Sequence, residues 1–264
     1  MPKIVLVKAK TSWGFSIRYP TQTAAQDSIP LPPPTTVLGA LALQYARYSR
    51  LPETTTLGTK LYSSAVNLLT NKIVKYCTSG IKYPSVVKHS DVNRSIMLIY
   101  QRHKEFKYHF AAQAMSKAYT LIPENPILLA YIVEDSYVEL ISKLAWGISS
   151  VGSKEGLVSV TDITIHDLKT VTKNIVDTPF ITPSNIVECV KDCMEVELCV
   201  FAPESYLAGS ICKSDKFLIP VHGGIRDLFG GAMRVRINDN AVTVEVPLDS
   251  NEYSYLVLPK EVVS

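Results

Sequence analysis

A run of prolines that leads directly into an apolar helix constrains the fold of this chain more than any other feature. Residues 30–41 read PLPPPTTVLGAL. Proline fixes φ near about −65°, so the three prolines at 32–34 hold the backbone extended and set the angle at which the next element starts. The hydroxyl of Thr35 or Thr36 can then accept hydrogen bonds from free amides of the first turn. We therefore predict a helix over residues 35–48.

Elements of alternating type indicate an α+β fold. The second predicted helix begins at Ser136 with Glu139 three residues later, a pairing typical of a capping box. The predicted elements are a strand over residues 3–10, a helix over 35–48, a buried strand over 128–133, a helix over 136–146 and a strand over 157–164. This double strand–helix–strand pattern suits a ferredoxin-like (RRM-like) sheet, with both helices on one face and the other face open to bind or pair.

Short strands separated by turns replace this pattern from about residue 169. They are predicted over residues 195–201, 234–237, 242–246 and 253–258. Residues 238–240 (NDN) indicate a hairpin turn between two of them, because Asn and Asp tolerate positive φ. We therefore divide the chain into a ferredoxin-like domain over residues 1–168 and a β-rich C-terminal subdomain over residues 169–264.

Charge is distributed unevenly along the chain, although the net charge is only +3. Residues 1–117 carry 16 Lys and Arg against four Asp and Glu, a net charge of +12, whereas residues 118–264 carry 11 against 20, a net charge of −9. Clustered Lys and Arg attract phosphates, so we favour nucleic-acid binding over a merely solvated surface for the first part. The acidic second part would face solvent or a basic partner.

The basic residues are densest between residues 71 and 109, where aromatic rings are interleaved with them. They are Lys72, Lys75, Lys82, Lys88, Arg94, Arg102, Lys104 and Lys107, with Tyr76, Tyr83, Tyr100 and Tyr108. Single-stranded RNA binders use such a combination to attract phosphates and stack bases. The alternation over residues 104–110 also fits a strand with its rings on one face, which is the more common use of aromatic residues.

Composition limits the class of protein. With 264 residues, 47% of them hydrophobic, the chain can bury a sizeable core in one large or two modest domains. The longest apolar run, residues 127–133, is too short to span a bilayer, and the first residues read as a strand rather than a signal peptide, so we expect a cytoplasmic protein. The five cysteines are expected to be reduced thiols, and without a Cys-x-x-Cys motif they indicate no metal site.

Glycine-containing segments are candidate ligand loops. Residues 152–156 (GSKEG) lie between the second helix and the strand after it, where backbone amides and Lys154 could hold a phosphate. They lack the Gly-Lys-Ser/Thr ending of a nucleotide-binding loop, and a plain helix-to-strand turn explains the glycines equally well. The glycines at 223–224 and 230–231 also indicate turns first.

Catalysis would rest on His103, Lys104, Tyr108 and His109. Metal-independent RNA cleavage needs a general base near the 2′ hydroxyl and a cation near the scissile phosphate. On a continuous strand the two histidines share a face but lie about 20 Å apart, too far to act on one phosphate without a turn between them. A metal-independent endoribonuclease is therefore our second hypothesis.

Three segments together resemble a known family. They are residues 13–18 (WGFSIR) after the first strand, residues 31–41 (LPPPTTVLGAL) at the first helix and residues 151–158 (VGSKEGLV) after the second helix. In this order they are similar to the CRISPR-associated RAMP superfamily, specifically to its Cas-five (Cas5) family of Cascade subunits and most of all to archaeal type I-A members. The resemblance covers about the first 165 residues.

This resemblance implies a RAMP domain with a long β-hairpin, the thumb, at about residues 70–112. Family members hold the 5′ handle of the CRISPR RNA and pack on a Cas-seven-type backbone subunit in an antiviral complex that also contains large and small subunits. Most are noncatalytic, because a separate endonuclease cuts the precursor. Subtype I-C cuts RNA itself, but its complete catalytic triad does not match this sequence.

The first hypothesis is therefore a noncatalytic RNA-binding subunit of Cascade, with no cofactor, metal or membrane partner. Lys8 and Lys10 share a face of the first strand and could contact one ligand, whereas lysines that only protect a sheet edge are an equal alternative. The predicted RNA-binding residues are Lys8, Lys10, Trp13, Arg18, Lys88, Arg94, Arg102, His103, Lys104, Lys107, Gly152, Ser153 and Lys154. A structural protein whose basic part contacts an acidic protein surface is a third hypothesis.

Overall fold

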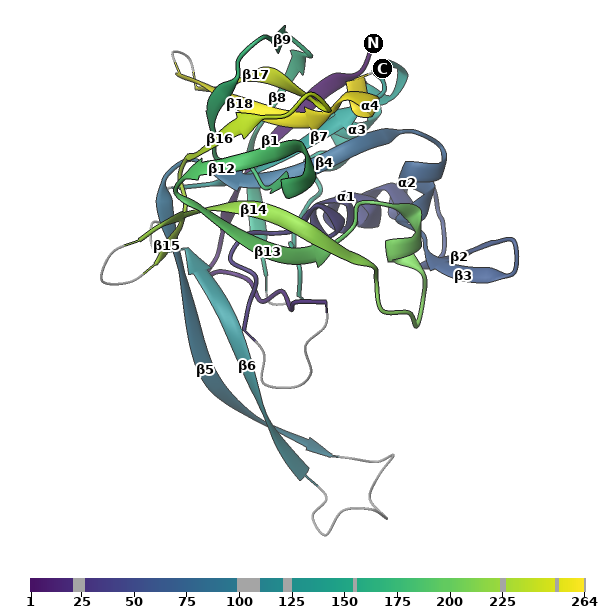
Figure 1. The fold of residues 1–264 in the computed structure, drawn as a ribbon. Helices are drawn as coiled ribbons and strands as arrows, with labels where there is room; N and C mark the ends of the chain where they lie inside the picture. The colour runs from purple at the N-terminus through teal and green to yellow at the C-terminus, as the bar shows by residue number, and fades with distance from the viewer. Residues whose placement is uncertain are drawn as a thin grey trace.

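A four-stranded antiparallel sheet forms the centre of the protein (Figure 1). The structure, a computed structural model, describes residues 1–20, 27–98, 110–120, 125–153, 156–223, 227–249 and 252–263, and for residues 90–98 and 110–120 the strand backbone. The strand order is β4–β7–β1–β8. The bounds are β1 (Lys3–Thr11), β4 (Val74–Ile81), β7 (Ile127–Val133) and β8 (Val158–Asp167). The strands predicted over 3–10, 128–133 and 157–164 are confirmed.

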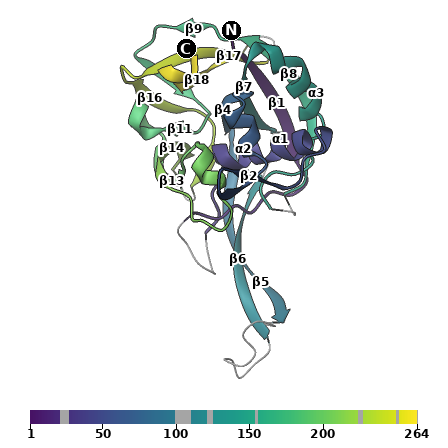
Figure 2. The ribbon, with the colours of Figure 1, turned by 90° about the vertical axis from the view of Figure 1, so that its right-hand side faces the viewer.

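Two helices cover one face of this sheet, α1 (Pro34–Tyr48) and α3 (Val138–Ala145) (Figure 2). Val5 and Val7 of β1 belong to one buried cluster with Leu41 of α1 and Ile141 of α3. A short helix, α2 (Val66–Thr70), precedes β4. None of the helices in the described ranges is long and apolar enough to cross a membrane. The two predicted helices are thus confirmed, and both lie on the predicted single face.

Neither helix begins with the side-chain cap that the sequence suggested. The residue before α1 is Pro33, whose carbonyl accepts the amides of Thr36 at 2.9 Å and Val37 at 3.0 Å. The predicted cap by Thr35 or Thr36 is wrong, because proline at the first helical position removes one free amide and the Pro33 carbonyl accepts two others. α3 follows a 3-10 turn, η1 (Asp135–Tyr137), without a side-chain cap, so the predicted cap by Ser136 is wrong as well.

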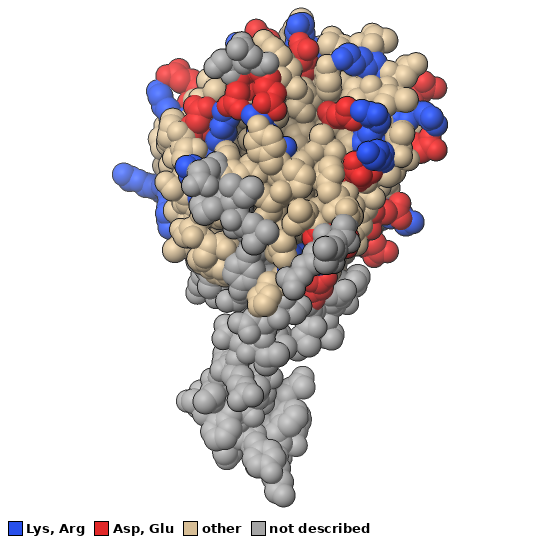
Figure 3. All heavy atoms as spheres, turned by 90° about the vertical axis from the view of Figure 1, so that its left-hand side faces the viewer, with Lys and Arg blue, Asp and Glu red and all other residues tan. Residues whose placement is uncertain are grey.

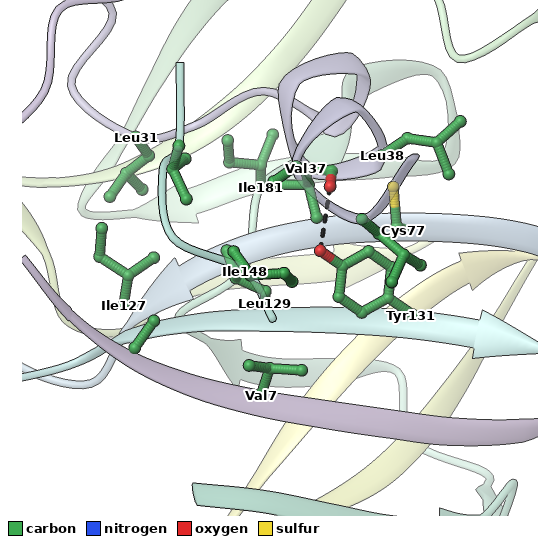
Figure 4. Close-up of a cluster of buried hydrophobic side chains, with 14 of the residues drawn as sticks. Val7, Leu31, Val37, Leu38, Cys77, Ile127, Leu129, Tyr131, Ile148 and Ile181 are labelled. Atoms are coloured by element: carbon green, nitrogen blue, oxygen red, sulfur yellow. Dashed lines mark hydrogen bonds between the residues drawn. The ribbon is translucent and has the colours of Figure 1, made fainter. Parts of the chain in front are cut away.

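Side chains of the central sheet fix the start of α1 instead. The Cys77 thiol of β4 donates a hydrogen bond to the carbonyl of Pro34 at 3.1 Å, and the Tyr131 hydroxyl of β7 donates to the carbonyl of Val37 at 2.9 Å (Figure 4). Burial raises the pKa of both groups well above the usual values, so both remain protonated donors. The entry of the polyproline segment into α1 is therefore anchored on two buried strands.

The opposite face of the sheet is covered by the C-terminal part of the chain. Two strands, β17 (Ala241–Asp249) and β18 (Glu252–Pro259), pair with each other, and α4 (Lys260–Val263) follows them. Ile4 and Leu6 of β1 and Leu128 of β7 share a buried cluster with Val244 and Leu256 of these strands. The predicted open face is therefore wrong. All seven residues of β7 are buried, as expected for a strand covered on both faces.

A long antiparallel hairpin projects from this body (Figures 1 and 2). It consists of β5 (Pro84–Leu98) and β6 (Phe110–Thr120), with a register shift between Asp91 and Ser95. Near its base, β5 also pairs with β15 (Leu228–Gly230). The segment predicted to alternate over 104–110 lies outside the described residues except for Phe110, the first residue of β6.

Short strands dominate residues 170–259. They are β9 (Thr170–Val171), β10 (Ile175–Thr178), β11 (Thr182–Pro183), β12 (Val187–Lys191), β13 (Cys193–Cys199), β14 (Ser214–His222), β15 and β16 (Met233–Ile237), with the 3-10 turns η2 (Ser184–Ile186) and η3 (Pro203–Tyr206). The remaining hairpin, β2 (Thr54–Leu57) with β3 (Lys60–Ser63), follows α1. The turn at 238–240 joins β16 to β17, which lie in different sheets, so the predicted hairpin there is wrong.

Four of the five cysteines form disulfide bonds. Cys189 pairs with Cys193 and Cys199 with Cys212, whereas Cys77 is a buried free thiol. The expectation of reduced thiols throughout is wrong. It relied on the odd cysteine count and on the expected cytoplasmic location. Neither of these shows which cysteine side chains meet in the folded chain.

Candidate nucleic-acid interface

A surface groove of about 630 Å³ brings together the three segments that carry the family resemblance. We call it the α1 groove. Its lining residues are Ser16, Ile17 and Arg18 from the link after β1, Thr36, Gly39, Ala40 and Leu43 from α1, and Ser150, Gly152 and Ser153 from the turn after α3. Segments separated by more than 100 residues therefore form one concave surface.

The helix contributes to this groove because of the spacing of its residues. Gly39 and Ala40 lie three and four residues after Thr36, and Leu43 lies four and three residues after them, so the four residues lie on one face of α1. Two of the four are small, and a methyl group added at Gly39 would meet no atom within 4 Å. The groove is therefore open above this part of the helix.

The glycine turn forms the opposite wall, and its geometry excludes a side chain at residue 152. Gly152 has φ +82°, and a Cβ atom there would lie 2.6 Å from Cγ1 of Ile17. The Val151 amide donates to the carbonyl of Gly156 at 2.8 Å, and the Gly156 amide donates to the carbonyl of Ser153 at 2.9 Å. Glycine at 152 is thus required by the close approach of the turn to the link after β1.

Two polar groups in the groove lack a partner among the described residues. The Ser153 hydroxyl is buried and makes no hydrogen bond there. Arg18 is exposed and forms no ion pair within the described part of the chain, while its backbone bridges to Ser28. A buried hydroxyl without a partner costs free energy, so a ligand oxygen that accepts from it would be favoured. The positive charge of Arg18 makes an anionic ligand the best match.

Two other predicted site residues are already engaged in ion pairs. Lys8 lies 3.3 Å from a carboxylate oxygen of Asp162 and 3.1 Å from one of Asp249. Lys88 pairs with Asp27, and its ammonium group lies 5.6 Å from the ring centroid of Phe229. Their charges are therefore balanced within the protein.

The remaining predicted site residues do not extend the groove in the described structure. Lys10 is exposed on β1, and Trp13 is partly exposed in the link that follows it. Arg94 lies in β5, described by its backbone. The residues that lie outside the described ranges are Arg102, His103, Lys104, Lys107, Tyr108, His109 and Lys154.

Ion pairs across the chain remove much of the charge separation seen along the sequence. Lys3 pairs with Asp135 at 3.6 Å and Asp167 at 3.5 Å, and Lys75 with Glu134 at 3.4 Å. On the face drawn in Figure 3, positive and negative side chains are likewise interspersed. Part of the acidic excess that we assigned to solvent or a basic partner therefore neutralises the first part of the same molecule.

Sequence reasoning missed several residues that line cavities of the structure. Ser16 and Leu43 were not selected, although Leu43 continues the helical spacing from Thr36. Lys82, two residues from the base of β5, was recognised as basic but not as a site residue. Helical periodicity could have identified Leu43, whereas the contacts of Lys82 depend on residues near the C-terminus.

Comparison with known proteins shows which sequences this chain resembles. No family model matches the chain. Three curated proteins of Saccharolobus solfataricus do: CRISPR-associated protein Cas5 3, at 30% identity over 165 residues, CRISPR-associated protein Cas5 2, at 29% over 191 residues, and CRISPR system aCascade subunit Cas5 1, at 28% over 169 residues. The chain is therefore similar to proteins of the Cas5 family. These alignments cover 61%, 70% and 63% of this chain.

The chain aligns with only part of each of these relatives, and a solved structure has a similar fold. The chain spans 65% of the first of these Cas5 relatives, just under two thirds, and 69% and 66% of the other two. A CRISPR protein from Archaeoglobus fulgidus has a similar structure, with a TM-score of 0.57, 22% identity and coverage of 96% of this chain and 98% of that one. At this identity the likeness concerns the fold, which is mixed α and β.

Proposed function

We propose that this chain is a Cas5-type, noncatalytic RNA-binding subunit of a type I CRISPR surveillance complex and that its α1 groove holds the 5′ handle of the CRISPR RNA. One observation carries the proposal: Arg18 without an ion-pair partner and the Ser153 hydroxyl without a hydrogen-bond partner, among the described residues, line the same groove. Phosphate oxygens can accept from both groups at once. The aCascade name of one relative supports the assignment to such a complex.

The central sheet and the hairpin support the domain assignment that goes with this function. The order β4–β7–β1–β8, with α1 and α3 on one face, is the order expected of a ferredoxin-like RAMP domain over residues 1–168. In this proposal the β5–β6 hairpin is the thumb that packs on the Cas-seven-type backbone subunit, beside the large and small subunits, and residues 169–264 form a separate subdomain. The site of action is the cytoplasm, where CRISPR RNA is found.

Measuring RNA affinity across a salt series tests the proposal. Each phosphate that a cation of the protein neutralises on a single strand contributes about 0.7 to the slope of log affinity against log salt concentration. Arg18→Ala is therefore expected to weaken binding of a labelled repeat-handle RNA and to reduce this slope by about 0.7. Lys60→Ala is the matched control, because it also removes one exposed positive charge but does not line the groove.

Two outcomes would contradict the proposal. If Arg18→Ala and Lys60→Ala weaken RNA binding equally, only the net charge of the protein governs RNA affinity. If Arg18→Ala leaves RNA affinity unchanged, the α1 groove is not part of the RNA interface. The same RNA, incubated with the protein in EDTA and resolved on a denaturing gel, is expected to remain intact. A discrete product ending in a cyclic phosphate would support the endoribonuclease hypothesis instead.

A further inference from the structure

Two lysines, one on β1 and one directly after β4, converge on one carboxylate on the face opposite α1. Lys8 Nζ lies 3.1 Å from Oδ1 of Asp249, and Lys82 Nζ lies 2.5 Å from Oδ2 of the same residue. Lys82 also lies 2.5 Å from Oε2 of Glu252, and Lys8 lies 3.3 Å from Asp162. The carboxylate of Asp249 is therefore held from both of its oxygens, as a phosphate would be held by two lysines.

The lysine side chains are more buried than the carboxylates with which they pair. The side chains of Lys8 and Lys82 are only 18% and 15% exposed, whereas those of Asp249 and Glu252 are 53% and 47% exposed. Lys8 lies on β1 and Lys82 directly follows the last residue of β4, whereas Asp249 is the last residue of β17 and Glu252 the first of β18. The ammonium groups are thus fixed at the bottom of the site, and the carboxylates approach them from the solvent side.

A cavity of about 370 Å³ adjoins these charges, and we call it the Lys8–Lys82 pocket. Leu128 and Leu248, both buried, line it together with Pro126, and Asn125 and Tyr83 also contribute to its wall. This volume lies in the usual range of small-ligand sites, about 300–1,000 Å³. The pocket has room for a single nucleotide unit.

An exposed aromatic ring stands at this pocket. Tyr83 is 51% exposed, and the ammonium group of Lys82 lies 5.0 Å from the centre of its ring. The Asn125 amide donates to the Tyr83 carbonyl at 3.0 Å and to the Ser85 hydroxyl at 2.7 Å, which fixes the backbone of Tyr83. A fixed, exposed ring beside cations is the arrangement on which single-stranded RNA binders stack a base.

We propose that the Lys8–Lys82 pocket is a second nucleotide subsite for single-stranded RNA and that Asp249 and Glu252 occupy its phosphate position when RNA is absent. The base of the nucleotide stacks on Tyr83, and its phosphate replaces the carboxylate of Asp249 between the two lysines. This inference rests on the proposed function and adds a site on the face of the sheet opposite the α1 groove.

The charge balance of the pocket fits an exchange of one anion for another. Burial disfavours the charged form of Lys82, but hydrogen bonds with Asp249 and Glu252 outweigh burial and raise its pKa. The hydrogen bonds from Lys82 and Lys8 also lower the pKa of the Asp249 carboxyl. Both shifts favour the charged forms of Lys82 and Asp249, and a phosphate that displaces Asp249 would keep Lys82 beside an anion.

Removing the internal anion tests the proposal. Asp249→Asn keeps the shape of the side chain and removes its charge, so it is expected to tighten binding of a labelled single-stranded RNA several-fold at low salt. The salt slope is expected to steepen by about 0.7 for each additional phosphate that the lysines neutralise. Adding Lys82→Gln to Asp249→Asn is expected to abolish both effects. Thermal melting of each variant checks that it is folded.

Glu245→Gln provides a matched control. Glu245 also lies on β17 and pairs with a surface lysine, Lys169, at 2.9 Å, outside the pocket. Both substitutions remove one negative charge, so an equal increase in affinity from the two would show a general charge effect and overturn the proposal. Unchanged or weaker binding by Asp249→Asn would overturn it as well. If adenosine monophosphate competes with the RNA and binds with equal affinity, the ligand of the pocket is a free nucleotide and not a polynucleotide.

The two proposals fail independently. If Arg18→Ala weakens RNA binding while Asp249→Asn changes nothing, the α1 groove remains an RNA site and the Lys8–Lys82 pocket does not. If Arg18→Ala is silent while Asp249→Asn tightens binding, the pocket remains and the assignment of the α1 groove is lost.

Discussion

Gly152→Ala probes the close approach on which the shape of the α1 groove depends. Gly152 has φ +82°, a conformation that costs an L-residue about 1–2 kcal/mol. The added methyl group would also lie 2.6 Å from Cγ1 of Ile17, which is 8% exposed and has little room to move. Overpacking of this kind costs about 1–3 kcal/mol. The expected loss of stability is therefore about 2–5 kcal/mol.

Thermal unfolding measures this loss, and a double-mutant cycle separates its two causes. In a chain of this size each kcal/mol lowers Tm by about 2–4 °C, so Gly152→Ala should lower it by about 4–20 °C. Ile17→Ala removes the Cγ1 atom that the new methyl group would meet and on its own costs about 2–5 kcal/mol. In that background Gly152→Ala should retain only the backbone cost of about 1–2 kcal/mol.

Gly39→Ala is the control, because it makes the same chemical change in the other wall of the groove. A Cβ atom at Gly39 meets nothing within 4 Å, and alanine is favoured over glycine inside a helix by about 0.5–1 kcal/mol. This variant should therefore be slightly more stable than the wild type. If Gly152→Ala cost the same with and without Ile17, or were as harmless as Gly39→Ala, the close approach of the turn would be refuted.

Three further predictions concern other parts of the fold. Replacing Cys199 and Cys212 by serine should destabilise the protein by about 3 kcal/mol, because a disulfide bond with a sequence separation of 13 restricts the unfolded chain. Urea unfolding without reductant measures this loss, and identical unfolding curves for variant and wild type would contradict the prediction. Tyr131→Phe should cost about 0.5–1.5 kcal/mol in the same assay, the usual value of one lost hydrogen bond; a higher stability would speak against the anchoring of α1. Lys82 and Lys8 lower the pKa of the Asp249 carboxyl. The contribution of this carboxylate to stability is therefore fully present above the unfolded pKa of about 3.9 and is lost as pH falls through the lower folded pKa. The stabilities of wild type and Asp249→Asn, measured by acid unfolding, should converge at low pH, and a difference in stability that stays constant with pH would contradict the ion pair.

Periodicity predicted the elements of the central sheet because burial leaves a direct pattern in the sequence. The apolar run of β7 and the helical spacing of α1 each report which side chains face the core. The cover on the second face could not be predicted in the same way. It comes from β17 and β18, more than 100 residues after β7, and pairing over that distance leaves no local pattern. The two disulfide bonds are local, with sequence separations of 4 and 13, and escaped prediction because cysteine spacing alone does not show which thiols meet.

The α1 groove was predictable in part. The three segments with family resemblance were recognised separately, and the sheet brings two of them together because Thr11 of β1 lies opposite Val158 of β8. The strand order alone therefore places the link after β1 beside the turn before β8. The missing partner of the Ser153 hydroxyl was not predictable, since it depends on how the atoms of one turn pack.

Counting basic residues did not distinguish Arg18 from Lys8, which both belong to the cationic first part of the chain. The structure separates them, because Arg18 is exposed without an ion-pair partner among the described residues, whereas Lys8 is 18% exposed between two carboxylates. The attraction of Lys8 for an incoming phosphate is offset until one of those carboxylates is displaced, and that of Arg18 is not. Arg18 should therefore act in the first encounter with RNA, and Lys8 only after the exchange at Asp249. Under the two proposals, the arrangement of ion pairs, rather than the number of Lys and Arg residues, would set the order in which these cations meet RNA.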